Sequence, residues 1–342
     1  MKKVFLFSLA VSLLACKAQQ PREISEANPM EYANTITAEE LKEHLYTFAS
    51  DEFEGRETGE PGQKMAAEYL KTEYKNLDIA SPLGGDDYYQ EVPGSFFTRG
   101  TIKDTENVLA FIQGSTKPEE VLVISSHYDH VGVDDEGNIY NGADDDGSGT
   151  VAILEIAEAF KKAQEDGFAP KRSILFLNVT GEEKGLVGSR YYTENPVFPL
   201  ANTVANLNID MIGRIGNDME SAGDYVYLIG SDKLSTELHE LSENVNEKYL
   251  NVNLDYTYND ENDPNRFYYR SDHYNFAKHD IPIIFYFNGV HEDYHRPTDT
   301  PDKIEYDLLA KRAKLVFLTA WEVANRDARP FVDKPTLSDK AE

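Results

Sequence analysis

The amino-acid sequence predicts an α/β fold in which a mixed, largely parallel central sheet is flanked by helices. From about residue 105 onward, apolar β-type runs alternate with helical patterns. The runs 121–124 and 174–177 contain only apolar residues, which is typical of central parallel strands buried on both faces. No internal repeat and no second compositional regime interrupts the 342 residues, so a single domain is expected.

The composition excludes several classes of protein. The chain carries 33 Lys and Arg against 61 Asp and Glu, a formal net charge of −28, and this excludes a general nucleic-acid binder. A 40% hydrophobic content supports a packed core and excludes collagen-like, low-complexity and wholly disordered chains.

The first residues have the pattern of an export signal. Lys2 and Lys3 form a positive region, and the apolar run 4–14 is too short to span a bilayer. The order Leu-Leu-Ala-Cys at 13–16 resembles the lipobox of bacterial lipoproteins. That resemblance implies a signal peptide at 1–15 and a lipidated Cys16 that anchors an exported chain to a bacterial membrane, facing the periplasm or the cell exterior. The alternative is a plain secretory signal with an incidental cysteine.

Cys16 is the single cysteine of the chain. It therefore excludes an internal disulfide and any zinc cluster made of cysteines. A metal site in this protein would need histidine and carboxylate ligands.

The elements that follow the signal are predicted from local patterns. Residues 16–36 lack sustained apolar periodicity and are expected to be a tether. Thr37 and Glu40 fit a capping box at the start of a helix. Apolar residues then recur at helical spacing: Leu41, Leu45 and Phe48.

A second amphipathic helix follows a glycine-containing turn at 55–62. It is marked by Met65, Ala66, Tyr69 and Leu70.

The remaining elements complete one catalytic domain at 37–328, followed by a C-terminal tail at 329–342. Residues 251–270, rich in Asn, Asp and Tyr, are predicted to be a long loop of the kind that shapes a specificity pocket. Strands are expected at 121–126, 173–180, 203–210 and 281–287. Helices are expected at 148–162, 233–249 and 304–325.

Residues of metal-ligand type follow the predicted strands. In open α/β sheets, ligands bind beyond the carboxyl ends of the strands, so these residues should converge on one rim. Any one of them alone could be a solvated loop carboxylate, a helix cap or a core histidine. They are His127 and Asp129, Asp144, Asp145 and Asp146, Glu182 and Glu183, Asp210, and His295.

This combination of residue types favours particular metals. Two histidines with three carboxylates and no thiolate suit zinc, cobalt or manganese. A carboxylate can bridge two cations, and two cations about 3.5–4 Å apart can share a hydroxide and polarise a scissile carbonyl.

Six segments resemble, in the same order, the motifs of peptidase family M28, a family of zinc aminopeptidases. The resemblance runs from about residue 38 to 325 and is specific because the order of all six is kept. The segments are 127–129 (H-x-D), 142–149 (G-A-x-D-[DN]-x-S-G), 181–186 (G-E-E-x-G-L), 208–211 (N-x-D-M), 271–273 (S-D-H) and 294–297 (Y-H-x-P).

The resemblance implies a fold like that of zinc-dependent exopeptidases and two Zn²⁺ ions, for which Co²⁺ or Mn²⁺ could substitute. Asp145 would bridge both ions. His127 and Asp210 would complete one site, and Glu183 and His295 the other.

It also implies roles around the ions. Glu182 would be the general base, taking a proton from the metal-bound water and passing it to the leaving amine. Asp129 would accept the free N–H of His127 and fix its tautomer. Asp272 would anchor the α-amino group of a peptide or, alternatively, cap a helix. Asp146 would support the same imidazole or contact the substrate.

The implied function is an exported, lipid-anchored, co-catalytic two-zinc hydrolase that removes N-terminal residues from peptides. One alternative keeps the fold and changes the reaction to that of a carboxypeptidase, a dipeptidase or a glutaminyl cyclase. A carboxypeptidase would need a cation such as Arg190, Arg214 or Arg270 for the terminal carboxylate. Another alternative is a peptide-binding lipoprotein without turnover.

The other histidines receive no ligand role from the motifs. His130 and His273 adjoin motifs without matching a ligand position, and His291 lies near the predicted rim. Those in or beside amphipathic helical patterns are expected to be structural: His44, His239 and His279.

Overall fold

The protein is described here by a computed structural model that covers residues 27–219 and 223–335. The predicted signal peptide, Cys16 and the tether up to residue 26 lie outside these residues.

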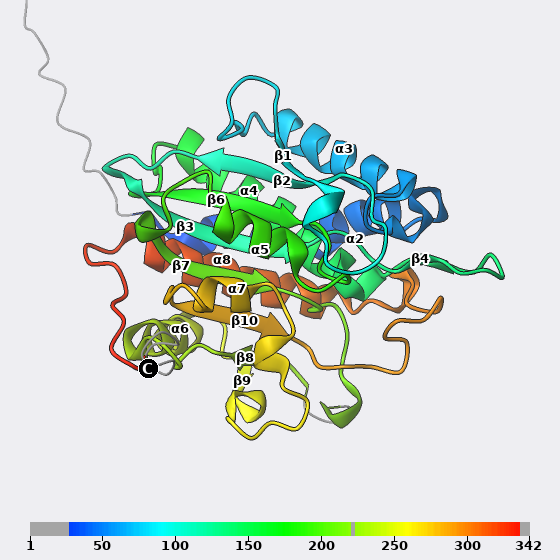
Figure 1. Cartoon of the computed structure of the whole chain (residues 1–342). Coiled ribbons are helices and arrows are strands. Elements are labelled where there is room, and N and C mark those ends of the chain that lie inside the picture. The colour runs from blue at the N-terminus through cyan, green and yellow to red at the C-terminus, as the bar shows by residue number, and fades with distance from the viewer. Residues whose placement is uncertain (1–26, 220–222, 336–342) are drawn as a thin grey trace, which may run out of the picture.

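An eight-stranded sheet crosses the whole domain (Figure 1). In spatial order its strands are β1 (Tyr89–Val92), β2 (Thr105–Ile112), β6 (Arg172–Val179), β3 (Lys117–His127), β7 (Thr203–Ile209), β10 (Ile283–Phe287), β8 (Tyr225–Ile229) and β9 (Asn253–Asp255).

The sheet is mixed with a parallel centre. Strands β6, β3, β7 and β10 pair in parallel with one another. Pairs β1–β2, β2–β6 and β10–β8 are antiparallel, and β9 pairs in parallel with β8 at the far edge. The predicted fold class is therefore confirmed, and the strands predicted at 121–126, 173–180, 203–210 and 281–287 are the four central ones.

Helices cover both faces of the sheet. Helices α5 (Val187–Glu194) and α7 (His273–Ala277) pack on one face. The opposite face carries α1 (Pro29–Ala33), α2 (Ala38–Phe48), α3 (Pro61–Asn76), α4 (Gly149–Glu165), α6 (Thr236–Tyr249) and α8 (Tyr306–Asn325).

Alternate residues of β3 supply the two hydrophobic cores. Leu122 and Ile124 pack beneath α4 and α8, whereas Val121 and Val123 pack on the side of α5 and α7. Successive side chains of a strand point to opposite faces, so an unbroken apolar run is buried on both. The burial on both faces that the apolar run of β3 predicts is therefore confirmed in the middle of the sheet.

The predicted start of α2 is confirmed. The Thr37 hydroxyl accepts a hydrogen bond from the Glu40 amide at 3.1 Å and donates one to the Glu40 carboxylate at 2.7 Å. The cap satisfies one of the amides that a helix start leaves without an intrahelical partner.

The predicted tether is too long. Residues 29–33 form α1, which packs against α4 and α8, and Tyr32, Ala33 and Ile36 are buried. Sequence patterns miss this helix because a single turn of five residues shows no periodicity.

Two other predicted segments are also corrected. The loop at 251–270 contains β9, which extends the sheet at its edge. The predicted tail is anchored where it is described: the Arg329 guanidinium donates to the carbonyls of Ala201 and Thr203, and the Asp333 carboxylate accepts from the Thr236 amide.

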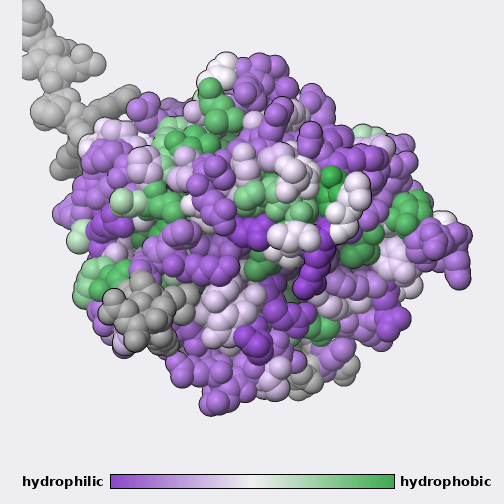
Figure 2. Space-filling view, viewed as in Figure 1, coloured by the Kyte–Doolittle hydropathy of each residue, from purple (hydrophilic) through white to green (hydrophobic). Residues whose placement is uncertain are grey.

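One face of the molecule is mainly polar (Figure 2). Figure 2 shows a largely hydrophilic face on which apolar residues form small, separated groups. Within the described residues, no helix is long and apolar enough to cross a membrane.

Candidate metal centre

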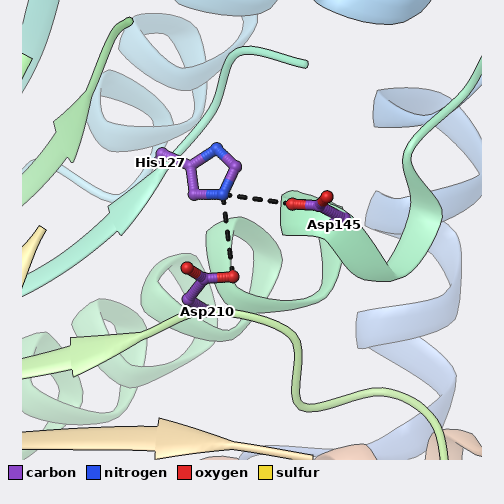
Figure 3. A group of neighbouring side chains, drawn as sticks. All are labelled: His127, Asp145 and Asp210. Carbon is purple, nitrogen blue, oxygen red and sulfur yellow. Dashed lines mark ion pairs between the residues drawn. The ribbon is translucent and has the colours of Figure 1, made fainter. Parts of the chain in front are cut away.

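Three of the predicted ligands meet at the carboxyl ends of the central strands (Figure 3). His127 is the last residue of β3, Asp210 directly follows β7, and Asp145 lies in the loop before α4. The Nε2 atom of His127 is 3.2 Å from Asp145 Oδ1 and 3.7 Å from Asp210 Oδ1. These three residues are the first cluster.

A second cluster forms around the other oxygen of Asp145. His295 Nε2 is 3.0 Å from Asp145 Oδ2 and 3.2 Å from Glu183 Oε1. His130 Nδ1 is 3.1 Å from the same Glu183 oxygen and 3.7 Å from Asp145 Oδ2. The structure thus brings together all five predicted ligands, with Asp145 shared, and adds His130 to them.

The residues present fit divalent cations. Asp145 Oδ2 and Glu183 Oε1 are buried, and neither has a hydrogen-bond partner among the described residues. Ligands bound tetrahedrally at zinc, with bonds of about 2.0–2.2 Å, lie roughly 3.3 Å apart, which is close to the separations in both clusters. Three carboxylates that converge without amide or hydroxyl donors leave a negative charge that a bound cation would balance.

Contacts with histidines lower the pKa values of two of these carboxylates, Asp145 and Glu183, in spite of burial. Burial and the charge of Asp145 oppose ionisation of Glu183, but contacts with His130 and His295 outweigh them and lower its pKa to about 2. Burial also opposes protonation of His295, yet Asp145 and Glu183 raise its pKa to about 10. Groups that prefer their charged states in this way are typical of functional sites.

A buried arginine holds the loops that carry the ligands. The guanidinium of Arg56 donates hydrogen bonds to the carbonyls of Tyr128, Asn141 and Gly142, at 2.9, 2.6 and 2.8 Å. These carbonyls flank His127 on one side and Asp145 on the other, so one side chain ties the two ligand segments together. Burial lowers the pKa of Arg56 to about 10, which leaves it charged near neutral pH.

A second group holds the backbone of the shared ligand. The Asp299 carboxylate accepts hydrogen bonds from the amides of Asp144 and Asp145 at 3.0 and 3.2 Å. The Asp144 carboxylate accepts from the Gly213 amide at 2.7 Å and pairs with His291 at 3.1 Å. His291 therefore acts on the centre through Asp144, a role that no motif indicated.

Asp146 joins three backbone segments around the centre. Its carboxylate accepts hydrogen bonds from the amides of His127, Gly149 and Met211, at 3.3, 3.0 and 3.0 Å. The side chain is wholly buried. The expected bond to the His127 imidazole is not formed, because the printed contacts of this carboxylate are all with backbone amides. The peptide bond between Asp145 and Asp146 is cis.

Asp129 differs in detail from its predicted role. His127 Nδ1 lies 3.0 Å from the backbone carbonyl of Asp129, whereas the nearest carboxylate oxygen is 3.8 Å away. The carboxylate instead accepts from the Thr58 hydroxyl at 2.6 Å and from the Glu182 amide at 3.2 Å. The tautomer of His127 is thus set by a carbonyl, and the Asp129 carboxylate positions the backbone of Glu182.

Glu182 lies on the wall of a pocket beside the first cluster. Burial, reinforced by the charges of Glu183 and Asp210, raises the pKa of Glu182 well above its ordinary value. A carboxylate with a raised pKa is a better proton acceptor. The lining residues of this pocket are His127, Asp145, Glu182, Asp210, Met211, Phe267, Arg270, Phe285, Phe287, Val290 and Tyr294.

Asp272 does not line that pocket. It is wholly buried, it accepts a hydrogen bond from the Ser189 hydroxyl at 2.5 Å, and burial raises its pKa to about 7. Its side chain also makes no capping hydrogen bond to α7. The alternative role as a helix cap is therefore wrong, because the carboxylate bonds the Ser189 hydroxyl of α5 instead.

Besides His291, three residues of the centre had no predicted role: His130, Arg56 and Asp299. His130 follows His127 by three positions, and that short spacing between two histidines was the available signal. Asp299 follows His295 by four positions, outside the matched motif. Arg56 is separated by 72 to 86 residues from the carbonyls that it bonds in the two ligand segments, so no local pattern could reveal this role.

Comparisons with known proteins give a family and several relatives. The profile of peptidase family M28 matches residues 107–320. Aminopeptidase NAALADL1 of Rattus norvegicus is 33% identical over 144 residues, 42% of this chain and 18% of that protein. Aminopeptidase YwaD of Bacillus subtilis is 28% identical over 232 residues, 66% of this chain and 46% of that protein. Both matches span less than half of the relative's length.

The fold also matches a solved structure. The structure of BSAP, a zinc aminopeptidase from Bacillus subtilis, aligns with a TM-score of 0.65 over 87% of this chain and 98% of that chain. The two sequences are 17% identical over the aligned part. This likeness establishes that the two chains share an architecture.

Proposed function

The chain belongs to peptidase family M28, and on that premise we propose that it is an aminopeptidase that binds two zinc ions and releases N-terminal residues from peptides. The observation that carries the proposal is the sharing of Asp145 between the two clusters, one oxygen facing each. A carboxylate used in this way is suited to bridge a pair of cations. Zinc is the metal named for the similar BSAP aminopeptidase.

In this proposal the protein side chains divide into ligands and a base. His127 and Asp210 hold one ion, Glu183 and His295 hold the other, and Asp145 holds both. Zinc, when bound, supplies Lewis acidity toward the scissile carbonyl and lowers the pKa of water.

Glu182 is the proton carrier of the proposed reaction. It accepts a proton from the attacking water and delivers it to the amine of the departing peptide. Its position supports this role: it lines the same pocket as His127 and Asp210, and its backbone is held by the Asp129 carboxylate. The raised pKa of Glu182 increases its affinity for that proton.

Apolar residues stand among the polar ones that line this pocket. They are Phe267, Phe285, Phe287 and Val290. We propose that they receive the side chain of the residue to be released, since apolar walls bind apolar side chains by removing them from water.

A second candidate function is favoured by one residue of the same pocket. Arg270 lines it, is exposed, and forms no ion pair with any residue of the described chain. Arg214, by contrast, is paired with Asp293 at 3.0 Å, and Arg190 donates to the carbonyl of Phe96. A guanidinium at this place would suit the terminal carboxylate of a dipeptidase or carboxypeptidase substrate.

For location, we propose the lipid anchor at Cys16, which lies outside the described residues. The support is the order of charged, apolar and small residues before that cysteine. Labelling cells with radioactive palmitate tests it: the wild-type chain should carry label and Cys16→Ser should not. An unlabelled wild-type chain would refute the anchor.

The test of the enzymatic proposal is hydrolysis of a panel of aminoacyl-p-nitroanilides by the purified full chain. We expect release that a chelator stops and zinc restores, with leucyl and phenylalanyl substrates cleaved faster than glutamyl ones. Glu182→Gln should lower kcat by about 10²–10⁴-fold while the bound zinc stays unchanged, because a general base contributes rate and not metal affinity.

Blocked peptides separate the two candidate functions. An aminopeptidase loses activity when the N-terminus is acetylated, whereas a carboxypeptidase loses it when the C-terminus is amidated. A chain that cleaves acetylated peptides, and in which Arg270→Ala abolishes this cleavage, would replace the first candidate with the second.

A further inference from the structure

His130 is a third histidine in the centre, and neither the family motifs nor the proposed roles use it. It is wholly buried and directly follows the segment that carries His127. Its Nδ1 atom is 3.1 Å from Glu183 Oε1 and 3.7 Å from Asp145 Oδ2. These are the two oxygens that His295 also approaches, at 3.2 and 3.0 Å.

The contacts of His130 have the distances of an ion pair without the alignment of hydrogen bonds. Neither of its ring nitrogens has a hydrogen-bond partner among the described residues, and the same holds for Glu183 Oε1 and Asp145 Oδ2. Atoms that bind one ion aim their lone pairs at a common point and not at each other. Short separations without mutual alignment are therefore what a shared ligand shell produces.

The backbone around His130 is shaped to admit its ring. Gly142 has a φ of +56°, and a Cβ atom there would lie 2.6 Å from Cγ and Cδ2 of His130. The Gly142 carbonyl is held by Arg56, and the His130 amide donates to the Arg56 carbonyl at 3.1 Å. The ring is thus clamped against bare backbone, in a place where any other residue at 142 would exclude it.

We propose that His130 is a fourth protein ligand, through Nδ1, of the ion held by Asp145, Glu183 and His295. The inference rests on the proposed two-zinc function and adds an asymmetry to it. The second cluster supplies four protein ligands, which is the number that closes a zinc site, whereas the first cluster supplies three, which leaves a position open.

The pocket supports this division. Its lining includes His127, Asp145 and Asp210 of the first cluster together with Glu182. Among the described residues that line it, none is His130, Glu183 or His295. The open ion therefore faces the base and the substrate, and the closed ion serves chiefly to fix Asp145 and Glu183 in place.

The competing role for His130 is that of a hydrogen-bond donor to Glu183. The two roles require opposite tautomers: a ligand carries no proton on Nδ1, whereas a donor must carry one there. Long-range ¹H–¹⁵N NMR of the ring nitrogens distinguishes them in the full chain loaded with zinc. The signals of His130 are assigned by their loss in His130→Asn.

We expect His130 Nδ1 to be unprotonated and to shift on zinc loading, with the proton on Nε2. A protonated Nδ1 in the zinc-loaded chain would overturn the inference. His273→Asn is the control, because His273 is equally buried but its Nε2 contacts the Tyr268 carbonyl, away from both clusters. Its loss should leave the His130 signals where they are.

Zinc affinity gives a second readout that does not depend on catalysis. Asparagine keeps an amide donor near the position of Nδ1, so it would rescue a hydrogen bond but not a strong ligand. We expect His130→Asn and His130→Ala each to weaken one of the two ions by more than about 100-fold, beyond the usual cost of losing an outer partner. Wild-type affinity in His130→Asn would contradict the inference.

The results separate this inference from the proposed function. A chain that binds two zinc ions and releases N-terminal residues, but has a protonated His130 Nδ1, refutes the fourth ligand alone. A chain with zinc on His130 Nδ1 and no hydrolysis of any substrate refutes the aminopeptidase and leaves the fourth ligand established.

Discussion

Two regions of this molecule bury carboxylates beside histidines, and they treat the charge in opposite ways. In the metal centre, Glu183 lies between two histidines and its pKa falls to about 2. Between helices α2 and α4, Glu155 is 2% exposed, its Oε1 is 3.6 Å from His44 Nε2, and its pKa rises to about 8. Burial raises the pKa of Glu155 first, and the charges of Glu40 and Glu158 add to the effect.

The difference shows that burial of a carboxylate is not by itself the sign of a metal site. His44 is itself kept neutral by burial, which lowers its pKa, so the helix layer holds a neutral acid beside a neutral base. In the centre, by contrast, the pKa values of Asp145 and Glu183 are lowered and those of His127 and His295 are raised, so these four groups favour their charged states. Convergence of ligand atoms from separate strands, and not burial, distinguishes the two regions.

The largest effect that this comparison predicts is for Asp145→Asn. Asp145 serves both clusters, so its neutral replacement should weaken both ions and lower kcat/KM by at least about 1,000-fold, as for residues that act as a unit. Zinc content by mass spectrometry and hydrolysis of leucyl-p-nitroanilide measure the two effects. Glu155→Gln, an equally buried change outside the centre, should keep zinc and activity. Full zinc content in Asp145→Asn would contradict the shared-ligand arrangement.

Zinc removal should come next in size. Ligands that bind only the folded state add RT ln(1 + [L]/Kd), about 4 kcal/mol when free zinc is 1,000 times Kd. Denaturant unfolding of the chelated and zinc-loaded chains measures the difference. The gain in unfolding free energy on zinc loading should be unchanged in Glu155→Gln and much smaller in Asp145→Asn. An equal increment in both variants would mean that zinc stabilises the protein elsewhere.

The raised pKa of the buried Glu155 predicts that the unfolding free energy depends on pH. Its pKa is about 8 in the folded chain against 4.5 for the ordinary group. The contribution of Glu155 to the unfolding free energy is therefore fully present below pH 4.5 and is lost as pH rises toward 8. The reason is that the folded state holds the carboxyl proton more tightly than the unfolded state does. Glu155→Gln should match wild type near pH 5 and exceed its unfolding free energy by about 2–4 kcal/mol at pH 9.

Urea unfolding at several pH values measures this difference. Glu165→Gln, near the end of the same helix and largely exposed, is the control and should show no such divergence. Parallel stability curves for wild type and Glu155→Gln would show that Glu155 titrates normally.

The smallest predicted effect concerns the hydrogen bond that orients His44. The Tyr69 hydroxyl lies 2.6 Å from His44 Nδ1 in a partly buried place. Tyr69→Phe should lower the unfolding free energy by about 0.5–1.5 kcal/mol, the net worth of one such bond, and should leave zinc binding unchanged. A loss of zinc would mean that the helix layer and the centre are coupled.

Much of the fold was predictable because the central strands carry their own signal. The runs at 121–124 and 174–177 are apolar at every position, and such runs are buried wherever they lie in an α/β sheet. The outer strands were not predictable in the same way. β1, β8 and β9 are short, and their pairing (β1 with β2, β8 with β10, β9 with β8) forms only in the tertiary structure. The α1 turn was missed because its burial depends on α4 and α8.

The centre was predictable to the extent that its residues stand at strand ends. His127 and Asp210 end neighbouring parallel strands, so the geometry of the sheet places them together. The partners that orient them were not predictable. Asp129 bonds the Glu182 amide across 53 residues, and Asp299 bonds the Asp144 amide across 155, and no local pattern encodes either contact.

The sequence by itself determined the fold class, the family and the five residues proposed as metal ligands, because strand burial and motif spacing are local properties of a chain. Only the tertiary structure decided what surrounds those ligands. It enclosed Asp272, turned the Asp146 carboxylate to backbone amides, and brought His130 against the oxygens of Glu183 and Asp145. The physical reason is that side-chain direction, burial and charge at this rim depend on contacts between segments far apart in sequence, which form only when the sheet is assembled.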